Sequence, residues 1–302
     1  MVKKILVTGS GGLVGSRFLE LYPNSSELLT PEIEILDITQ KIQVEKFFQK
    51  EKPEVVVHLA AFTDVSVAEN ERDNKNGLCW KINIKGVENL VSMIDPFKTH
   101  LIHISTDYVF PGSKENPGPY PENTIAEKDS SKVTWYGFTK AEGERIVRNK
   151  LDDKATILRL IYPVRAKYDK KLDYLRKPLS LFDEGKLYPM FTDQQVSITY
   201  IDEACEIIKR IIKKKAYGTF HSSTPDTASP YELISYLIEK ARGVKNIVKP
   251  SSLDDFLASS GNSPVRYPKF GGLKVEKTAK ILGFKFSPWK KVIDTLISQG
   301  LK

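Results

Sequence analysis

The segment Thr8-Gly9-Ser10-Gly11-Gly12-Leu13-Val14-Gly15 follows a short β-rich run over residues 4–7 and opens a predicted helix over residues 12–22. Its glycines at positions 9, 12 and 15 recur at every third residue. Glycine permits a tight turn between a strand and a helix and lets backbone amides come close to a ligand. The helix N-terminus adds free N–H groups and a partial positive charge. The segment therefore predicts the pyrophosphate site of a bound dinucleotide.

Strands and helices alternate on the C-terminal side of this turn. The predicted strands are residues 27–30, 53–59, 101–105 and 156–160, and the predicted helices between them are residues 40–50, 80–93 and 135–149. The run over 53–59 is continuously apolar, as in strands that are buried on both faces. This order predicts an α/β fold, a Rossmann-type doubly wound parallel sheet with helices on both faces.

The alternation loosens after about residue 162. Helices are predicted over residues 200–214, 230–241, 275–282 and 288–298, with Ser229 as the N-cap of the second and a proline in the first turn of the last. We expect a dinucleotide-binding domain over residues 1–162, joined by part of 195–222, and a smaller mixed α/β substrate domain mainly over residues 163–302. The prolines and glycines between residues 110 and 134 predict a long irregular loop, which we interpret as a wall of the active site.

Composition narrows the class of protein. With 302 residues, 40% of them hydrophobic and 28% charged, the chain is typical of a soluble globular protein. No apolar run approaches the roughly 20 residues that span a bilayer. The first residues lead directly into a strand and do not read as a signal peptide. Together with only two cysteines, Cys79 and Cys205, this predicts a cytoplasmic protein with reduced thiols and no membrane contact.

Charge and histidine content exclude two further kinds of site. The net charge of +8 comes from lysines and arginines spread over many helices, without a nucleic-acid motif, so we expect solvated faces and no nucleic-acid partner. A positive charge also suits an anionic substrate such as a nucleotide diphosphate sugar. His58, His100, His103 and His221 lack the spacing of metal ligands, so we expect them to be structural and predict no metal site.

Three positions after the glycine turn are candidates for contact with the cofactor. Asp37 could accept a hydrogen bond from the adenine amino group or cap the helix that follows, and the two roles are compatible. Ala60 and Ala61 end a strand with small side chains, which lets a cofactor lie against the backbone. No acidic residue or arginine stands directly after the second strand to read the ribose, so the choice between NAD and NADP stays open.

Tyr136 and Lys140 stand four residues apart and so share one face of a predicted helix. A lysine ammonium should lower the pKa of a nearby phenol, which could then give its proton to a carbonyl oxygen as hydride reaches the carbon. Ser105 and Thr106 end the preceding strand, where polar side chains of a parallel sheet face the ligand crevice. The Thr106 hydroxyl could hydrogen-bond a substrate oxygen there.

Four strings of sequence resemble the extended short-chain dehydrogenase/reductase superfamily, and the similarity runs nearly end to end. Within it they are most similar to the reductase branch that includes dTDP-4-dehydrorhamnose reductase. The strings cover residues 58–69, 83–90, 104–110 (Ile-Ser-Thr-Asp-Tyr-Val-Phe) and 136–144 (Tyr-Gly-Phe-Thr-Lys-Ala-Glu-Gly-Glu). Sugar dehydratases of the superfamily tend to carry Asp-Glu after the catalytic threonine, whereas this chain has Asp107-Tyr108, which argues against dehydration.

The resemblance implies roles for individual residues. It implies a catalytic set of Thr106, Tyr136 and Lys140. It implies a cofactor site lined by Gly9, Gly12, Leu13, Val14, Asp37, Ile38, Ala60, Ala61, Thr63, Asn83, Ser105, Tyr136 and Lys140. It implies that the substrate meets Thr63, Val65, Thr106, Tyr162 and Arg266, where Tyr162 replaces a tryptophan common in these reductases and Arg266 lies near the nucleotide.

The resemblance implies an NAD(P)H-dependent reductase of a nucleotide-linked 4-keto-deoxysugar, as in dTDP-rhamnose biosynthesis, and a homodimer is common in the superfamily. The residues before Tyr136 and the segment 195–199 depart from the branch, which leaves the sugar, its base and the stereochemistry open. A sugar-nucleotide epimerase is one alternative. A non-catalytic NADP-binding regulatory subunit, like the β subunit of methionine adenosyltransferase, is the other.

Overall fold

The structure is a computed structural model that describes residues 4–261 and 263–301. The predicted domains also include residues 1–3, 262 and 302, which lie outside the described residues. The chain packs into two compact units. Unit 1 is built from the described residues of Met1–Phe110, Ile125–Arg159 and Cys205–Phe220, and unit 2 from those of Pro111–Thr124, Leu160–Ala204 and His221–Lys302.

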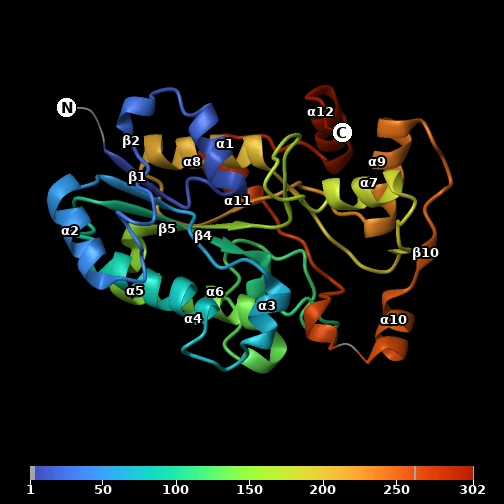
Figure 1. Cartoon of the computed structure of the whole chain (residues 1–302), viewed down its shortest axis with the longest axis horizontal. Helices are drawn as coiled ribbons and strands as arrows, with labels where there is room; N and C mark the ends of the chain where they lie inside the picture. Colours follow the sequence, from blue (N-terminus) through green and yellow to red (C-terminus); the bar gives the residue numbers. More distant parts are fainter. Residues whose placement is uncertain (1–3, 262, 302) are drawn as a thin grey trace. The chain divides into compact units, whose positions relative to one another are not determined.

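A six-stranded sheet forms the centre of unit 1, in the order β2-β1-β3-β4-β5-β9 (Figure 1). The strands are β1 (Ile5–Thr8), β2 (Leu28–Leu29), β3 (Val55–His58), β4 (His100–Thr106), β5 (Ala155–Leu160) and β9 (Gly218–Ser222). The sheet is parallel and flanked by helices. The predicted Rossmann-type fold is therefore confirmed.

Helices cover both faces of this sheet (Figure 1). They are α1 (Leu13–Leu21), α2 (Lys41–Glu51), α3 (Val65–Asn70), α4 (Leu78–Trp80), α5 (Gly86–Ser92), α6 (Trp135–Leu151) and α8 (Ile201–Lys214). Leu6, Val56 and Leu101 are paired in register across three strands and share one core with α2, α5 and α6. Alternate strand residues point to the other face, which is also covered by helices, and this explains why these strands are buried almost throughout.

Two predicted elements differ in detail. The second strand contains only Leu28–Leu29, because a 3₁₀ turn over Ser25–Glu27 uses the residues before it. The helix predicted over 80–93 is continuous with α4 and α5 but contains a π-helical stretch, Lys81–Lys85. An apolar period of 3.6 residues does not reveal the extra residue of a π turn, which often marks a functional site.

Unit 2 has its own core beneath helices α7 (Arg176–Asp183), α9 (Pro230–Arg242) and α12 (Trp289–Ser298). Two parallel strand pairs join it: β6 (Pro163–Val164) with β8 (Thr199–Tyr200), and β7 (Met190–Phe191) with β10 (Pro250–Ser251). The other helices are α10 (Leu253–Ser260) and α11 (Glu276–Leu282), with a 3₁₀ turn over Pro264–Arg266.

Capping sets the helix boundaries of unit 2. Ser229 is the N-cap of α9 and forms a reciprocal capping box with Glu232, which confirms the predicted start of that helix. Pro288 is the N-cap of α12 and so lies one residue before the first turn in which it was predicted. Among the described residues, no helix is both long enough and apolar enough to cross a membrane.

Candidate active site

The glycine turn after β1 is an open cradle of backbone. Gly9 has a φ of +69°, in the left-handed region that favours glycine. A β-carbon there would lie 2.6 Å from the backbone nitrogen of Ala60, and one on Gly15 would lie 2.3 Å from the Gly9 carbonyl oxygen. The amide of Gly12 donates to that same oxygen at 3.0 Å. Because side chains cannot enter, the turn and the first residues of α1 fit a pyrophosphate.

Leu13 and Val14 begin α1 immediately after this cradle, and both are half-buried. Their backbone N–H groups belong to the first turn, which has no intrahelical acceptors. Gly12, the N-cap, offers no side chain to satisfy those groups. The turn therefore presents backbone, and no capping side chain, to a ligand.

Asp37 and Ile38 lie in the turn before α2. The Asp37 carboxylate accepts hydrogen bonds from the Thr39 N–H at 2.9 Å and the Thr39 hydroxyl at 2.8 Å. Helix α2 takes Gln40 as its N-cap, so the reading of Asp37 as the cap of that helix is wrong. The Ile38 side chain is buried, and a β-carbon on Gly86 would lie 2.6 Å from its Cδ1 atom. A ligand beside Ile38 would therefore contact its backbone and not its side chain.

Asn83 fixes the segment that follows β3. It is almost fully buried in the π-helical stretch. Its Oδ1 accepts the Phe62 N–H at 2.9 Å, and its Nδ2 donates to the Phe62 carbonyl at 3.1 Å and to the Thr139 hydroxyl at 3.0 Å. The amide of Asn83 is therefore engaged within the protein, and it positions residues 60–63.

The positioned segment carries three of the predicted ligand contacts, and Val65 follows directly after it. Ala60 and Ala61 are half-buried at the end of β3, and the Ala60 N–H donates to the Thr8 hydroxyl at 3.3 Å. Thr63 is exposed, and Val65 is the half-buried first residue of α3. Small and accessible residues thus line this end of the sheet.

Thr106 and Tyr136 meet beyond the carboxyl end of the sheet. His103 of β4 pairs with His58, the last residue of β3, so β4 continues three residues further and ends at Thr106. Tyr136 lies in the first turn of α6. The Thr106 side chain lies close enough to the Tyr136 phenol to act on its pKa. The two predicted residues are therefore neighbours.

Lys140 follows one turn later on α6. Its ammonium donates to the Ile104 carbonyl at 2.7 Å, two residues before Thr106 on β4. Thr134 caps the helix, since its hydroxyl accepts the Gly137 N–H at 3.1 Å. The structure therefore gathers the three predicted catalytic side chains at one strand end, and all three are buried.

The electrostatics of the phenol differ from the expectation. The pKa of Tyr136 is raised well above its usual value of 10.0, first by burial and next by the carboxylate of Asp107. The predicted lowering by Lys140 is therefore wrong. A dry site penalises the phenolate, and a neighbouring negative charge penalises it further. Tyr136 is consequently a firmly protonated donor at neutral pH.

Burial also shifts the two ionisable neighbours. It lowers the pKa of Lys140 to about 8, against the opposing effect of the Glu144 carboxylate. It raises the pKa of Asp107 to about 7, although Asp107 accepts a hydrogen bond from the Thr106 hydroxyl at 3.1 Å. Both groups therefore change charge close to neutral pH.

A buried ion pair beneath the site was missed in the sequence. Glu144 of α6 accepts from Arg159 of β5 through Nε at 2.8 Å and Nη2 at 2.7 Å. The Ser105 hydroxyl donates to the same carboxylate at 2.6 Å, so Ser105 is engaged with the core. The signal available was an arginine inside the apolar strand predicted over 156–160.

His58 and His103 pack beside each other under Lys140, with ring centroids 5.4 Å apart. Burial and then the charge of Lys140 lower the pKa of His58 to about 3, and the same causes lower the pKa of His103. The Thr8 hydroxyl hydrogen-bonds His58 Nδ1 at 2.7 Å. Both rings are therefore neutral parts of the core.

The remaining predicted contacts belong to unit 2. Tyr162 has a φ of +39° and stacks on Tyr174, with ring centroids 4.1 Å apart. Arg266 is half-buried and ends the 3₁₀ turn that begins at Pro264. Over residues 4–261 and 263–301, no group of three or more histidine, cysteine or acidic side chains could hold a metal ion.

Three comparisons with known proteins agree with this geometry. A family model described as RmlD substrate binding domain matches residues 3–301. The chain is 26% identical over 301 residues to a dTDP-4-dehydrorhamnose reductase of Aggregatibacter actinomycetemcomitans, covering 97% of this chain and 98% of the relative. It is 25% identical to methionine adenosyltransferase 2 subunit beta of Rattus norvegicus, covering 97% of this chain and 89% of that relative.

Solved structures give the same result. The crystal structure of dTDP-4-dehydrorhamnose reductase from Bacillus anthracis str. Ames, in complex with NADP, matches with a TM-score of 0.82 and 27% identity. The match covers 99% of this chain and 100% of that chain. The similarity thus includes both compact units.

Proposed function

The chain belongs to the RmlD substrate binding domain family, and on that premise we propose that it is an NAD(P)H-dependent reductase of a nucleotide-linked 4-keto-deoxysugar. The proposed activity is like that of dTDP-4-dehydrorhamnose reductase, the name of relatives that match along nearly their whole length. The observation that carries it is the gathering of Thr106, Tyr136 and Lys140, all buried, at the end of β4.

In the proposed reaction Tyr136 protonates the keto oxygen of the sugar, and Thr106 orients that oxygen by a hydrogen bond. The raised pKa of Tyr136 keeps the phenol protonated until the oxygen gains negative charge. Lys140 is mostly an ammonium at neutral pH, because its pKa is about 8, and its charge would stabilise the phenolate that remains. The reduced nicotinamide, when bound, supplies the hydride for the keto carbon.

The proposed cofactor site uses backbone on one side and small residues on the other. Gly9, Gly12 and the first turn of α1 would hold the pyrophosphate with N–H groups. Asp37 would lie at the adenine, and Ala60 and Ala61 would let the dinucleotide lie against the strand end. In this proposal Asn83 acts through the backbone it fixes, as the contact with Phe62 suggests.

The proposed substrate contacts are those that the sequence predicted. Thr63, Val65 and Tyr162 would approach the sugar, and Arg266 would bind the nucleotide diphosphate through its fixed positive charge. Whether NADPH or NADH is preferred is part of the test. The predicted homodimer and cytoplasmic location also stay predictions, which sedimentation velocity and cell fractionation would check.

The deciding experiment measures loss of the reduced-nicotinamide absorbance with purified protein, NADPH or NADH, and a dTDP-4-keto-6-deoxysugar. Consumption that requires the sugar supports the reductase, and the faster cofactor identifies the preference. Conversion of a sugar nucleotide without added reductant would instead indicate an epimerase. In parallel, Tyr136→Phe should reduce turnover by at least roughly 100-fold while NADPH binding is unchanged. Undiminished turnover would contradict the proposed role of the phenol.

A second candidate function is a regulatory subunit that binds NADP without catalysis. The observation that favours it is the similarity to methionine adenosyltransferase 2 subunit beta over 97% of this chain. It predicts cofactor binding, no turnover of any keto sugar, and a stable complex with a synthetase. The neighbouring Thr106 and Tyr136 favour the enzyme, because a pure binder does not need a buried phenol beside a hydroxyl.

A further inference from the structure

In unit 2, the described residues of the range 253–267 form an excursion, a segment whose two ends lie close together. The excursion contains α10, the 3₁₀ turn Pro264–Arg266 and the proposed nucleotide ligand Arg266. One short run, residues 192–195, is hydrogen-bonded to both ends of this excursion. On the entering side, the Thr192 N–H donates to the Ser251 carbonyl at 2.9 Å, directly after the pairing of β7 with β10.

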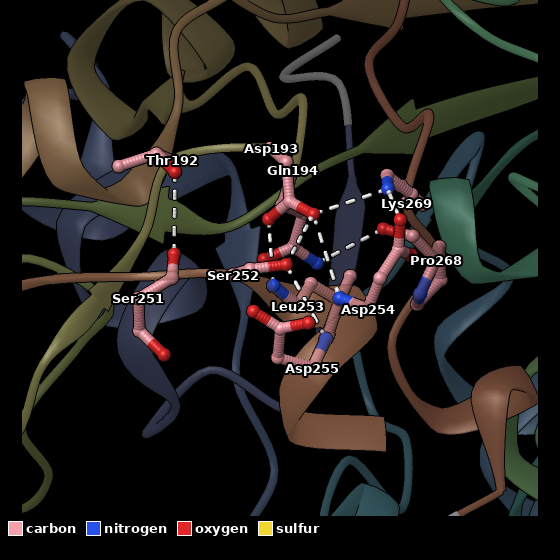
Figure 2. A network of polar contacts seen from close by, with 10 residues as sticks. All are labelled: Thr192, Asp193, Gln194, Ser251, Ser252, Leu253, Asp254, Asp255, Pro268 and Lys269. Atoms are coloured by element: carbon pink, nitrogen blue, oxygen red, sulfur yellow. Dashed lines mark hydrogen bonds and ion pairs between the residues drawn. The ribbon is translucent and has the colours of Figure 1, made fainter. Parts of the chain in front are cut away.

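Asp193 is the centre of the entering side (Figure 2). Its carboxylate accepts from the Leu253 N–H at 2.6 Å, the Ser252 hydroxyl at 3.1 Å and the Asp254 N–H at 3.4 Å. These donors belong to the N-cap and first turn of α10, whose N–H groups have no partner within the helix. A side chain from a distant part of the sequence thus supplies the acceptors for the start of α10.

The same carboxylate also reaches the departing side of the excursion. Lys269 donates to Asp193 at 3.1 Å and is hydrogen-bonded to Asp254 as well. The pKa of Asp193 is lowered to about 2, since its hydrogen bonds, from Leu253 N–H first and Lys269 next, outweigh the effect of burial. Asp193 therefore remains an anion at every physiological pH and joins both ends of the excursion electrostatically.

Gln194 and Gln195 hold the departing side through the backbone. Gln194 Nε2 donates to the Pro268 carbonyl at 2.9 Å, as Figure 2 shows. The Gln195 N–H donates to the Lys269 carbonyl at 2.8 Å, and the Gly271 N–H returns a bond to the Gln195 carbonyl at 2.9 Å. Residues 192–195 therefore lie between two segments, and each end of the excursion has several bonds to them.

Aromatic rings close the interior of the excursion. Phe191 packs against Phe256 of α10 at 5.4 Å and against Tyr267 at 6.4 Å, and Phe256 and Tyr267 pack at 5.4 Å, all between ring centroids. Tyr267 is the direct neighbour of Arg266 in the chain. The rings and the Asp193 contacts thus fix the backbone that carries this arginine.

We propose that Asp193 is a positioning residue, which holds the excursion 253–267 so that Arg266 is placed for the nucleoside diphosphate part of the substrate. This inference rests on the proposed function, because it assigns Arg266 to a nucleotide ligand. In this proposal Arg266 contacts the nucleotide itself, whereas Asp193 acts only by holding the segment that carries Arg266. Loss of the Asp193 charge should therefore weaken nucleotide affinity without changing the chemical step.

The test compares Asp193→Asn with Asp183→Asn. The first change keeps the size of the side chain and one acceptor oxygen but removes the charge that meets Lys269. The second removes a carboxylate of unit 2 that is paired with Arg242 at 2.7 Å, away from the excursion in sequence and contacts. For each protein we would measure dTDP affinity by calorimetry, amide hydrogen exchange over 253–267, and kcat and KM for the keto sugar.

Asp193→Asn is expected to weaken dTDP binding roughly tenfold and raise KM similarly, with kcat within about twofold and faster exchange over 253–267. Asp183→Asn should leave affinity and exchange unchanged. Lys269→Met repeats the test from the other partner, should Asp193→Asn fail to fold. Unchanged dTDP affinity in both excursion variants overturns the inference, and so does faster exchange with unchanged affinity.

Failure of the proposed function is distinguishable from failure of this inference. Wild-type protein that binds dTDP but reduces no keto sugar would contradict the reductase. Calorimetry would still measure how Asp193→Asn changes the affinity for dTDP, so the inference could be tested on its own. Wild-type protein that binds neither dTDP nor another nucleoside diphosphate would overturn both.

Discussion

A β-carbon on Gly137 would lie 2.0 Å from the carbonyl oxygen of Tyr108, closer than any real contact of this kind. Helix α6 therefore approaches the 3₁₀ turn Asp107–Val109 as closely as two backbones can. That turn directly follows Thr106, and Gly137 directly follows Tyr136. The glycine thus allows the turn of α6 that carries the phenol to lie close to the strand end that carries Thr106.

Gly137→Ala should push α6 away from this turn and separate the two hydroxyl groups. We expect turnover to fall roughly 100-fold, because a displacement of about 1 Å has that effect on a positioned group. Stability should fall by about 1–3 kcal/mol from overpacking, despite the better helix propensity of alanine. Steady-state kinetics and urea unfolding measure the two effects.

Gly143→Ala is the matched control for this change on the same helix. A β-carbon there would lie 3.3 Å from the Asn83 carbonyl, which requires a shift of only a few tenths of an ångström. It should retain most of the activity. Equal losses in the two variants would show that glycine matters in α6 generally and that the contact with Tyr108 is not the cause.

Asp107 should make stability depend on pH. Its pKa is about 7 in the folded protein, raised mainly by burial, against about 3.9 when unfolded. Between these two pKa values the folded state holds a proton that the unfolded state has released. The stability that protonated Asp107 provides at low pH is therefore lost as the pH rises from about 4 to about 7. Above pH 7 its contribution no longer changes.

Asp107→Asn should remove that loss. Urea unfolding at pH 5 and pH 8 should show the variant gaining on wild type with rising pH, by an amount on the order of a few kcal/mol at most. Parallel pH profiles for the two proteins would mean that Asp107 is ionised at pH 5 as well.

The sequence was sufficient for the parts of the site that depend on local geometry. Gly9, Gly12 and Gly15 predicted the cradle, because only a turn without side chains joins a strand to a helix so tightly. Thr106 was placed at the ligand crevice because polar residues at the ends of parallel strands face it. Its grouping with Tyr136 came from the resemblance to the reductases.

The parts that escaped prediction depend on packing between distant residues. Nothing in the spacing of Glu144 and Arg159 shows that they share a buried position, since charged residues usually lie on solvated faces. The direction of the Tyr136 pKa shift depends on how dry the site is and on Asp107, which outweigh a lysine one turn away. The run 192–195 likewise gains its hydrogen bonds to both ends of the excursion only when residues 252–254 and 268–271 fold against it.

Removing one partner of the buried pair should be costly. Glu144→Gln leaves the Arg159 guanidinium, which is fully buried, without its countercharge. We expect the free energy of unfolding to fall by about 3–5 kcal/mol. Combining Glu144→Leu with Arg159→Met should recover much of that loss, because it removes both charges. Urea unfolding measures all three proteins.

The control for this prediction is Glu142→Gln on the same helix. Glu142 pairs with Arg145, whose side chain is about half exposed, so the change should cost less than about 1 kcal/mol. A similar small cost for Glu144→Gln would mean that water reaches Arg159.

Tyr162 has a backbone conformation that aromatic residues rarely adopt, with a φ of +39°. Such a conformation costs on the order of 1–3 kcal/mol and persists only where packing fixes it. The Tyr174 ring supplies that packing, since it stacks on Tyr162 at 4.1 Å with the planes 24° apart. Tyr174 should therefore hold in place the Tyr162 ring, which we propose contacts the sugar.

Tyr174→Leu removes this support and leaves Tyr162 in place. We expect KM for the keto-sugar nucleotide to rise about 3- to 10-fold, because an aromatic pair contributes about 0.5–1.5 kcal/mol, with kcat and the KM for NADPH nearly unchanged. Phe284→Leu, which breaks another aromatic pair of unit 2 at 4.9 Å, is the control and should alter stability only. If Tyr174→Leu lowers kcat and leaves KM as it was, the stack serves the chemical step, and Tyr162 does not act by binding the sugar.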